Sequence, residues 1–165
     1  MDEDLFNKIK KEKRESRIAR DNSEDALTWN VMRFLEKQDL LKGFLSEISK
    51  KIITETELIL WSYSPKENKT WSLLKAARKE FEGTESGGSE PDIIILTDKV
   101  LYIFEAKLTA TNKTKPTNSS NKKKYETGGH NLFKQIFKGD YQSVVSERYE
   151  LMRFWPLGSW IAIKL

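Results

Sequence analysis

The chain of 165 residues contains no cysteine and a single histidine, His130. The absence of cysteine excludes disulfide bonds, thiolate catalysis, iron–sulfur clusters and thiolate zinc sites. One histidine cannot supply an all-imidazole metal site or a motif that needs two histidines, such as HExxH. If the protein is an enzyme, carboxylates and lysines must therefore carry its chemistry.

The sequence also lacks a long apolar run. No stretch approaches the roughly 20 apolar residues of a membrane-spanning helix, and the first twenty residues lack the apolar segment of a signal peptide. A cytoplasmic protein without a membrane partner is therefore expected. Hydrophobic residues make up 38% of the chain and include eight Phe, five Trp and five Tyr, which suffices for one folded domain with a modest core.

The formal net charge is +4, and the basic excess is concentrated in one segment. From Lys107 to Tyr125 there are six lysines and no acidic residue, in a stretch rich in Thr, Asn and Ser. This composition predicts a flexible basic loop over residues 108–130, which is either a solvated loop or a contact for a polyanion. The candidate nucleic-acid-binding residues are Lys113, Lys115, Lys122, Lys123 and Lys124.

Hydrophobic periodicity and turn residues predict a polar helical arm over residues 1–21, followed by a domain over 22–165. Within this domain the expected order is helix, strand, helix, hairpin, helix, strand, which indicates a mixed α/β fold with a small central mixed β-sheet flanked by helices. Helices are predicted over 24–37, 40–50, 71–81, 131–137 and 141–154, and strands over 57–64, 91–97, 100–107 and 160–165. The core-facing side of the first of these helices is predicted to be Leu27, Val31, Phe34 and Leu35.

The strongest strand signals form a hairpin around Asp98-Lys99. A two-residue turn there sets a register in which Asp92 lies opposite Glu105, and Lys107 shares the face of Glu105. Two opposed carboxylates destabilise a sheet, so a cation is expected between them. Lys107 is one candidate and a divalent metal is the better one, with Mg²⁺ or Mn²⁺ favoured by the oxygen ligands.

Pro91-Asp92 followed by Glu105-Ala106-Lys107 resembles the motif of the PD-(D/E)xK phosphodiesterase superfamily, which includes restriction endonucleases and many repair nucleases. The resemblance implies a restriction-endonuclease-like core. In that core a helix is followed by a three-stranded meander, a helix and a strand, with the motif on the second and third strands. The predicted helix over 71–81 is additional to this pattern.

By this resemblance, Asp92, Glu105 and the backbone carbonyl of Ala106 are metal ligands, with Mg²⁺ as the cofactor and Mn²⁺ as a substitute. Lys107 orients the attacking water and offsets charge on the scissile phosphate. Glu24 matches an acidic metal ligand on the first core helix, although an acid at that position also complements the helix N-terminus. Gln135, with Gln142 as its competitor, matches a catalytic glutamine on the helix after the motif.

The function implied is a metal-dependent nuclease that hydrolyses phosphodiester bonds of DNA, with RNA left open and endonuclease action favoured over exonuclease action. One alternative is a nucleic-acid-binding module of the same fold without catalysis. Another is an unrelated α/β interaction protein in which Glu105 and Lys107 form a surface ion pair. Because a chain with one site cuts one strand at a time, a homodimer or a larger partner chain is expected, and the sequence also leaves open that the chain is a fragment.

Overall fold

The computed structural model describes residues 3–13, 23–85, 88–108, 113–116, 119–137 and 147–165. The chain divides into two compact units. We call Met1–Trp71 with Pro91–Leu108 the sheet unit, and Ser72–Glu90 with Thr109–Leu165 the helical unit. Within the described ranges, no helix combines the length and the apolar composition that crossing a membrane requires.

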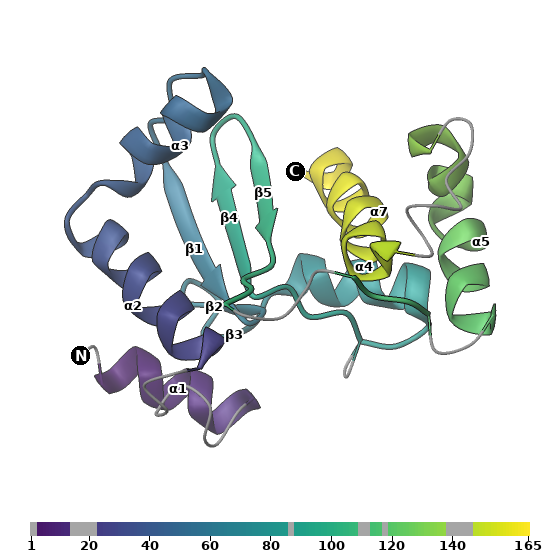
Figure 1. Cartoon of the computed structure of the whole chain (residues 1–165), viewed down its shortest axis with the longest axis horizontal. Helices are drawn as coiled ribbons and strands as arrows, with labels where there is room; N and C mark the ends of the chain where they lie inside the picture. Colours follow the sequence, from purple (N-terminus) through teal and green to yellow (C-terminus); the bar gives the residue numbers. More distant parts are fainter. Residues whose placement is uncertain (1–2, 14–22, 86–87, 109–112, 117–118, 138–146) are drawn as a thin grey trace. The chain divides into compact units, whose positions relative to one another are not determined.

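The sheet unit contains a five-stranded sheet, so the predicted α/β class is confirmed (Figure 1). The strand order is β3-β2-β1-β4-β5, and every described pairing is antiparallel. The prediction of a mixed sheet is therefore wrong, because the strand expected over 160–165 forms part of a helix instead. The strands are β1 (Thr56–Leu60), β2 (Tyr63–Ser64), β3 (Lys69–Thr70), β4 (Ile93–Thr97) and β5 (Leu101–Phe104).

The strand predicted over residues 57–64 is broken by a two-residue turn at Trp61 and Ser62. Both residues have left-handed backbones, with φ values of 45° and 68°, and Tyr63 pairs back onto Leu60. Such a turn normally carries Asn or Gly, so the residue types at these two positions do not predict it. The fully buried indole of Trp61 stacks on Trp29 with ring centroids 6.4 Å apart, and this burial offsets the local backbone cost.

Three helices belong to the sheet unit: α1 (Glu3–Lys13), α2 (Glu24–Lys37) and α3 (Leu41–Ser49). The bounds of α2 agree with the prediction, and its N-terminus is capped by Ser23, whose hydroxyl accepts a hydrogen bond from Ala26 N at 3.0 Å. The helices share one core with the sheet. Its buried members are Ile9 of α1, Trp29 and Met32 of α2, Leu41 and Leu45 of α3, and Ile53, Leu58, Leu60, Trp61, Tyr63, Ile93 and Ile95.

The face that α2 presents to this core differs from the prediction. Leu27, Val31 and Phe34 were expected inside, but they are 45%, 45% and 59% exposed. Trp29 and Met32 lie on the opposite side of the helix and are buried. The sequence contains an apolar row on each side of α2, and the sheet packs against the row that carries the large indole.

The described helices of the helical unit are α4 (Ser72–Glu82), α5 (Ser119–Ile136) and α7 (Tyr149–Lys164), which pack on one another. A flexible loop was predicted over residues 108–130, but the chain is helical from Ser119 onward. The helix is held by Tyr125, which is fully buried and stacks on Phe81. Residues 109–112, 117–118 and 141–146 lie outside the described ranges.

The prediction of a strand over residues 160–165 is wrong, because α7 continues through Pro156 to Lys164. Leu157 and Ile161, about one helical turn apart, are buried, and so is Met152 in the first half of α7. Packing of α7 against α4 and α5 outweighs the break that Pro156 and Gly158 indicate locally.

Candidate functional site

The two strands that carry the motif have the predicted register. Ile93 pairs with Phe104 and Leu96 pairs with Leu101, and Thr97 N donates to Val100 O at 3.2 Å to close the turn. Asp92 directly precedes β4 and Glu105 directly follows β5, so both acids lie at the same end of the hairpin. The register prediction is confirmed.

Asp92 is held in place by two backbone hydrogen bonds. Its carbonyl accepts from Trp61 N at 3.0 Å, which extends the pairing of β1 and β4 by one residue. Its carboxylate oxygen Oδ2 accepts from Ala106 N at 2.9 Å, which ties the side chain to the segment after β5. The first bond fixes the backbone at Asp92, and the second fixes its carboxylate.

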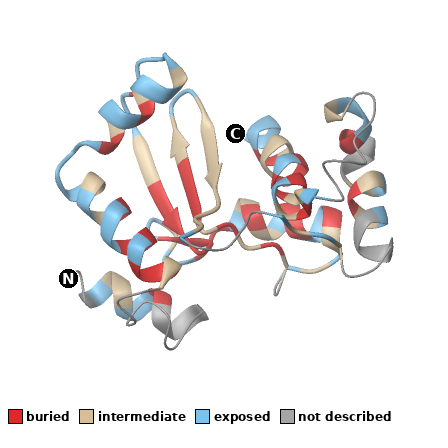
Figure 2. Ribbon diagram, viewed as in Figure 1, coloured by how far each residue is buried: buried red, intermediate tan, exposed pale blue. Residues whose placement is uncertain are grey.

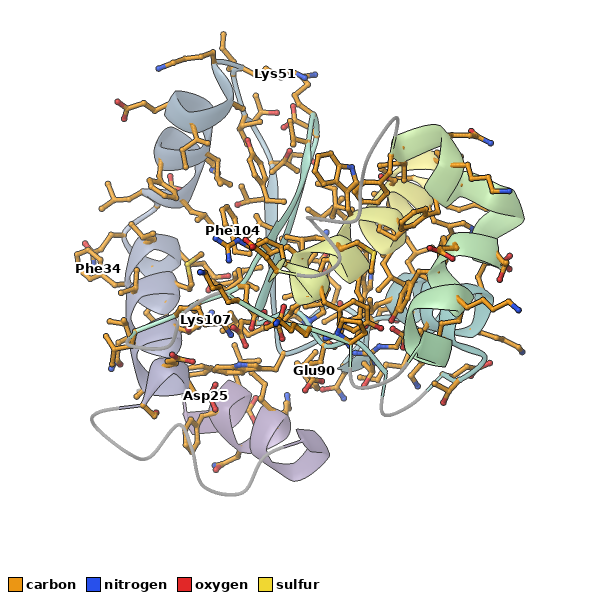
Figure 3. All side chains as sticks on the ribbon, turned by 45° about the vertical axis from the view of Figure 1, so that its right-hand side comes forward. Asp25, Phe34, Lys51, Glu90, Phe104 and Lys107 are labelled. Carbon is orange, nitrogen blue, oxygen red and sulfur yellow. The ribbon has the colours of Figure 1, made fainter. Side chains whose placement is uncertain are left out.

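Glu105 and Lys107 form a close ion pair. Lys107 Nζ donates to Glu105 Oε1 at 2.6 Å, and the exposed fraction is 22% for the Lys107 side chain and 7% for the Glu105 side chain. Lys107 is labelled in Figure 3, and the pair is partly buried. It places an ammonium group directly beside the candidate metal ligand.

Burial raises the pKa of Asp92, and the charge of Asp25 acts in the same direction. The hydrogen bond from Ala106, the charge of Lys107 and a hydrogen bond with Glu105 act against this rise. Asp92 and Glu105 thus form a pair of partly buried acids at the same end of the hairpin, with the charge of Lys107 beside them. Such a pair gains most from a cation that both carboxylates can contact.

The N-terminus of α2 brings two further acids to this region. Glu24 Oε1 accepts a hydrogen bond from Leu108 N at 3.0 Å, so the predicted Glu24 does reach the motif segment. Asp25 is only 6% exposed and acts electrostatically on Asp92 (Figure 3). Asp25 was not among the predicted site residues. The sequence signal that could have identified Asp25 is that it directly follows Glu24. Because adjacent helix positions point in different directions, two consecutive acids at the start of a helix can reach different parts of the sheet.

The remaining predicted site residues belong to the helical unit, whereas the site itself is made by the sheet unit. Gln135 has an exposed side chain on α5, and Gln142 lies outside the described residues. Lys113, Lys115 and Lys123 are exposed or half-exposed, Lys124 lies over the Tyr125 ring at 5.3 Å, and the side chain of Lys122 lies outside the described part.

Among the residues that the structure describes, no three acidic or histidine side chains form a group that could hold a metal ion. The oxygen donors at the end of the hairpin are the carboxylates of Asp92 and Glu105 and the backbone carbonyl of Ala106, the residue directly after Glu105. This set fits Mg²⁺, which is usually bound through one or two carboxylates and keeps several water molecules or phosphate oxygens.

The chain shows no match to a protein-family model, to a curated protein or to a solved structure. The function of the protein is therefore inferred from the geometry of the site.

Proposed function

We propose that the protein is a metal-dependent nuclease that hydrolyses phosphodiester bonds, with DNA as the preferred substrate. One observation carries the proposal: the register of β4 and β5 places Asp92 and Glu105 at the same end of the hairpin, with Asp92 bonded to Ala106 N and Lys107 paired to Glu105. A purely structural sheet gains nothing from two half-buried carboxyl groups side by side. A site that binds a divalent cation and a phosphate, by contrast, uses two carboxylates side by side as metal ligands.

The order of elements around this site supports a restriction-endonuclease-like core in part. A helix (α2) is followed by the antiparallel meander β1-β4-β5, with the motif at the ends of β4 and β5. The segment β2-β3-α4 is inserted between the first two strands of the meander. A helix, α5, follows the motif as in the family pattern, but α7 takes the place of the final strand. The proposed likeness therefore covers α2 through β5 most closely.

In the proposed reaction, Asp92, Glu105 and the Ala106 carbonyl would hold Mg²⁺, for which Mn²⁺ can substitute. When bound, the ion polarises the phosphoryl group and lowers the pKa of a bound water. The protein supplies fixed geometry: the bond from Trp61 N anchors the backbone at Asp92, and the bond from Ala106 N keeps its carboxylate from rotating away. Preorganised ligands of this kind avoid reorganisation at the moment of reaction.

Lys107 contributes positive charge where the phosphate accumulates negative charge. Its Nζ lies beside Glu105, so a phosphate bound at the carboxylates comes within reach of the ammonium group. We assign Lys107 to orienting the attacking water and to stabilising the transition state. Glu24 holds the backbone after Lys107 through Leu108 N, which keeps the lysine directed toward the site.

The experiment that tests the proposal is a cleavage assay on linear duplex, circular duplex and single-stranded DNA and on RNA. Each substrate is incubated with Mg²⁺, Mn²⁺ or EDTA and with wild type or Glu105→Gln. Glu57→Gln is the matched control, because Glu57 is a carboxylate of the same sheet that is 10% exposed in its side chain and paired to Lys66 at 3.0 Å.

We expect metal-dependent cleavage of circular DNA by wild type and Glu57→Gln, and a loss of roughly 10²-fold or more in Glu105→Gln. Salt-sensitive DNA binding without cleavage by any folded protein would contradict the nuclease and favour the non-catalytic binding module. If the protein cleaved RNA and none of the DNA substrates, RNA would be its substrate in place of DNA. Equal cleavage by wild type and Glu105→Gln would show that the site lies elsewhere.

A further inference from the structure

The sheet unit carries an apolar face that its own core does not use. We define the outer face as Leu27, Val31 and Phe34 of α2 together with Leu40, Phe44 and Ile48 along α3. Each of these side chains is between 44% and 59% exposed. Phe34 points away from the sheet (Figure 3), and exposed residues follow the outer sides of both helices (Figure 2).

The spacing of the outer face is that of a helix packing surface. Leu27, Val31 and Phe34 follow one another at intervals of four and three residues. Apolar side chains at these intervals line the contact between two packed helices. They lie opposite Trp29 and Met32, so α2 is apolar on both sides. A helix that is apolar on two sides is normally covered on both.

The size of the outer face is suited to a specific interface. From their exposed fractions, its six side chains present roughly 600 Å² of apolar surface per copy, near the roughly 800 Å² that each partner contributes to a standard interface. A rim of polar residues would add to this area. Ile52, which is 80% exposed just after α3, extends the apolar surface further.

The charges around the outer face favour a second copy of this chain over a strongly charged partner. Apart from the buried Asp25, residues 24–52 contain four acidic and five basic side chains, so neither sign of charge dominates around the outer face. An anionic membrane or a nucleic acid selects for basic residues, whereas a two-fold axis brings a patch against itself and requires balanced charges. We propose that the outer face is the interface of a homodimer related by two-fold symmetry.

This inference is independent of the proposed nuclease function, because the dimer is measured without substrate or metal. The mass of the full chain is measured by sedimentation equilibrium and light scattering across a concentration series, for wild type, Phe34→Glu and Phe44→Glu. The matched control is Ile163→Glu, which places the same charge on an apolar residue of α7 that is 69% exposed and lies outside the outer face. Because all three residues are at least 44% exposed, circular dichroism and thermal unfolding should match the wild type in every variant.

We expect wild type and Ile163→Glu to have twice the monomer mass of 19.3 kDa, and each outer-face variant to dimerise at least ~30-fold more weakly. A wild type that stays monomeric at ~100 µM would overturn the proposal, as would a dimer that Phe34→Glu and Phe44→Glu leave intact. Flotation of a monomeric wild type with vesicles of phosphatidylcholine and phosphatidylserine would assign the outer face to a membrane surface instead.

Discussion

The carboxylate of Asp92 accepts a hydrogen bond from the backbone N–H of Ala106 at 2.9 Å, across the hairpin formed by β4 and β5. This single bond connects the first acid of the motif to the residue between the other two motif side chains. It depends on the strand register, since a slip by one residue would place Asp92 on the other face of the sheet. The geometry of the candidate site is thus a direct consequence of how the hairpin turns.

Replacing Lys107 should separate metal binding from catalysis. Lys107→Met removes the ammonium group that contacts Glu105 at 2.6 Å but keeps most of the apolar stem. We expect DNA cleavage to fall by about 10²-fold or more, because the transition state loses a positive charge. Mn²⁺ affinity, measured by isothermal titration calorimetry, should be unchanged or higher, since the ion no longer competes with Lys107 for Glu105.

Lys66→Met is the matched control for this experiment, because Lys66 pairs with Glu57 at 3.0 Å in the same sheet unit. It should leave both cleavage and Mn²⁺ affinity as in the wild type. A Lys107→Met protein that cleaves within about threefold of the wild-type rate would contradict the role assigned to Lys107.

The turn of the hairpin should make stability depend on pH in acid. Asp98 accepts hydrogen bonds from Thr54 N at 3.0 Å and Thr54 Oγ1 at 2.8 Å, and these bonds lower its pKa to about 2. A depressed pKa stabilises the fold above the unfolded value of 3.8, and this contribution is lost as the pH falls through about 2. Asp98→Asn should therefore be less stable than wild type at pH 5 and equal to it below pH 2, in urea unfolding.

Thr54→Val tests the cause of this shift. The variant removes the hydroxyl donor and should raise the Asp98 pKa toward 3.8, as followed by NMR titration. An Asp98 pKa that stays near 2 in Thr54→Val would assign the shift to the backbone donors alone.

Two helical glycines should respond in opposite ways to alanine. A Cβ on Gly128 of α5 would lie 2.8 Å from Phe81 Cδ1 and 3.0 Å from Phe81 Cα, so Gly128→Ala should destabilise the fold by about 1–3 kcal/mol. A Cβ on Gly43 of α3 meets no atom within 4 Å, so Gly43→Ala should stabilise it by about 0.5–1 kcal/mol. Urea unfolding measures both, and stabilisation by Gly128→Ala would rule out the close approach of α4 and α5.

The sequence predicted those parts of the fold in which local signals decide the structure. The register of Asp92 and Glu105 follows from two apolar strands and a short turn, all within 16 residues. The α2 bounds follow from its Ser23 cap. The turn at Trp61 and Ser62 could not be foreseen, because burial of an indole against Trp29 decides it.

Tertiary packing also explains the other differences from the predictions. Trp160-Ile-Ala-Ile163 has the alternation of a strand, but Ile161 is buried along α7 with Leu157 and so remains helical. Asp25 was missed because its role depends on which side of α2 faces the sheet. That choice is made by the packing of Trp29 and is not visible in the spacing of Leu27 and Val31.

The most direct test of the central claim is the Mg²⁺-dependent rate of nicking or linearising circular duplex DNA by Asp92→Asn, compared with wild type and Glu57→Gln. The asparagine keeps an oxygen that can accept from Ala106 N, so the hairpin is retained while the ligand charge is lost. We predict activity in wild type and Glu57→Gln that EDTA abolishes, and a rate at least ~10²-fold lower in Asp92→Asn. Wild-type protein that binds DNA but leaves it intact with Mg²⁺ and Mn²⁺, or an Asp92→Asn protein as active as wild type, would contradict the account.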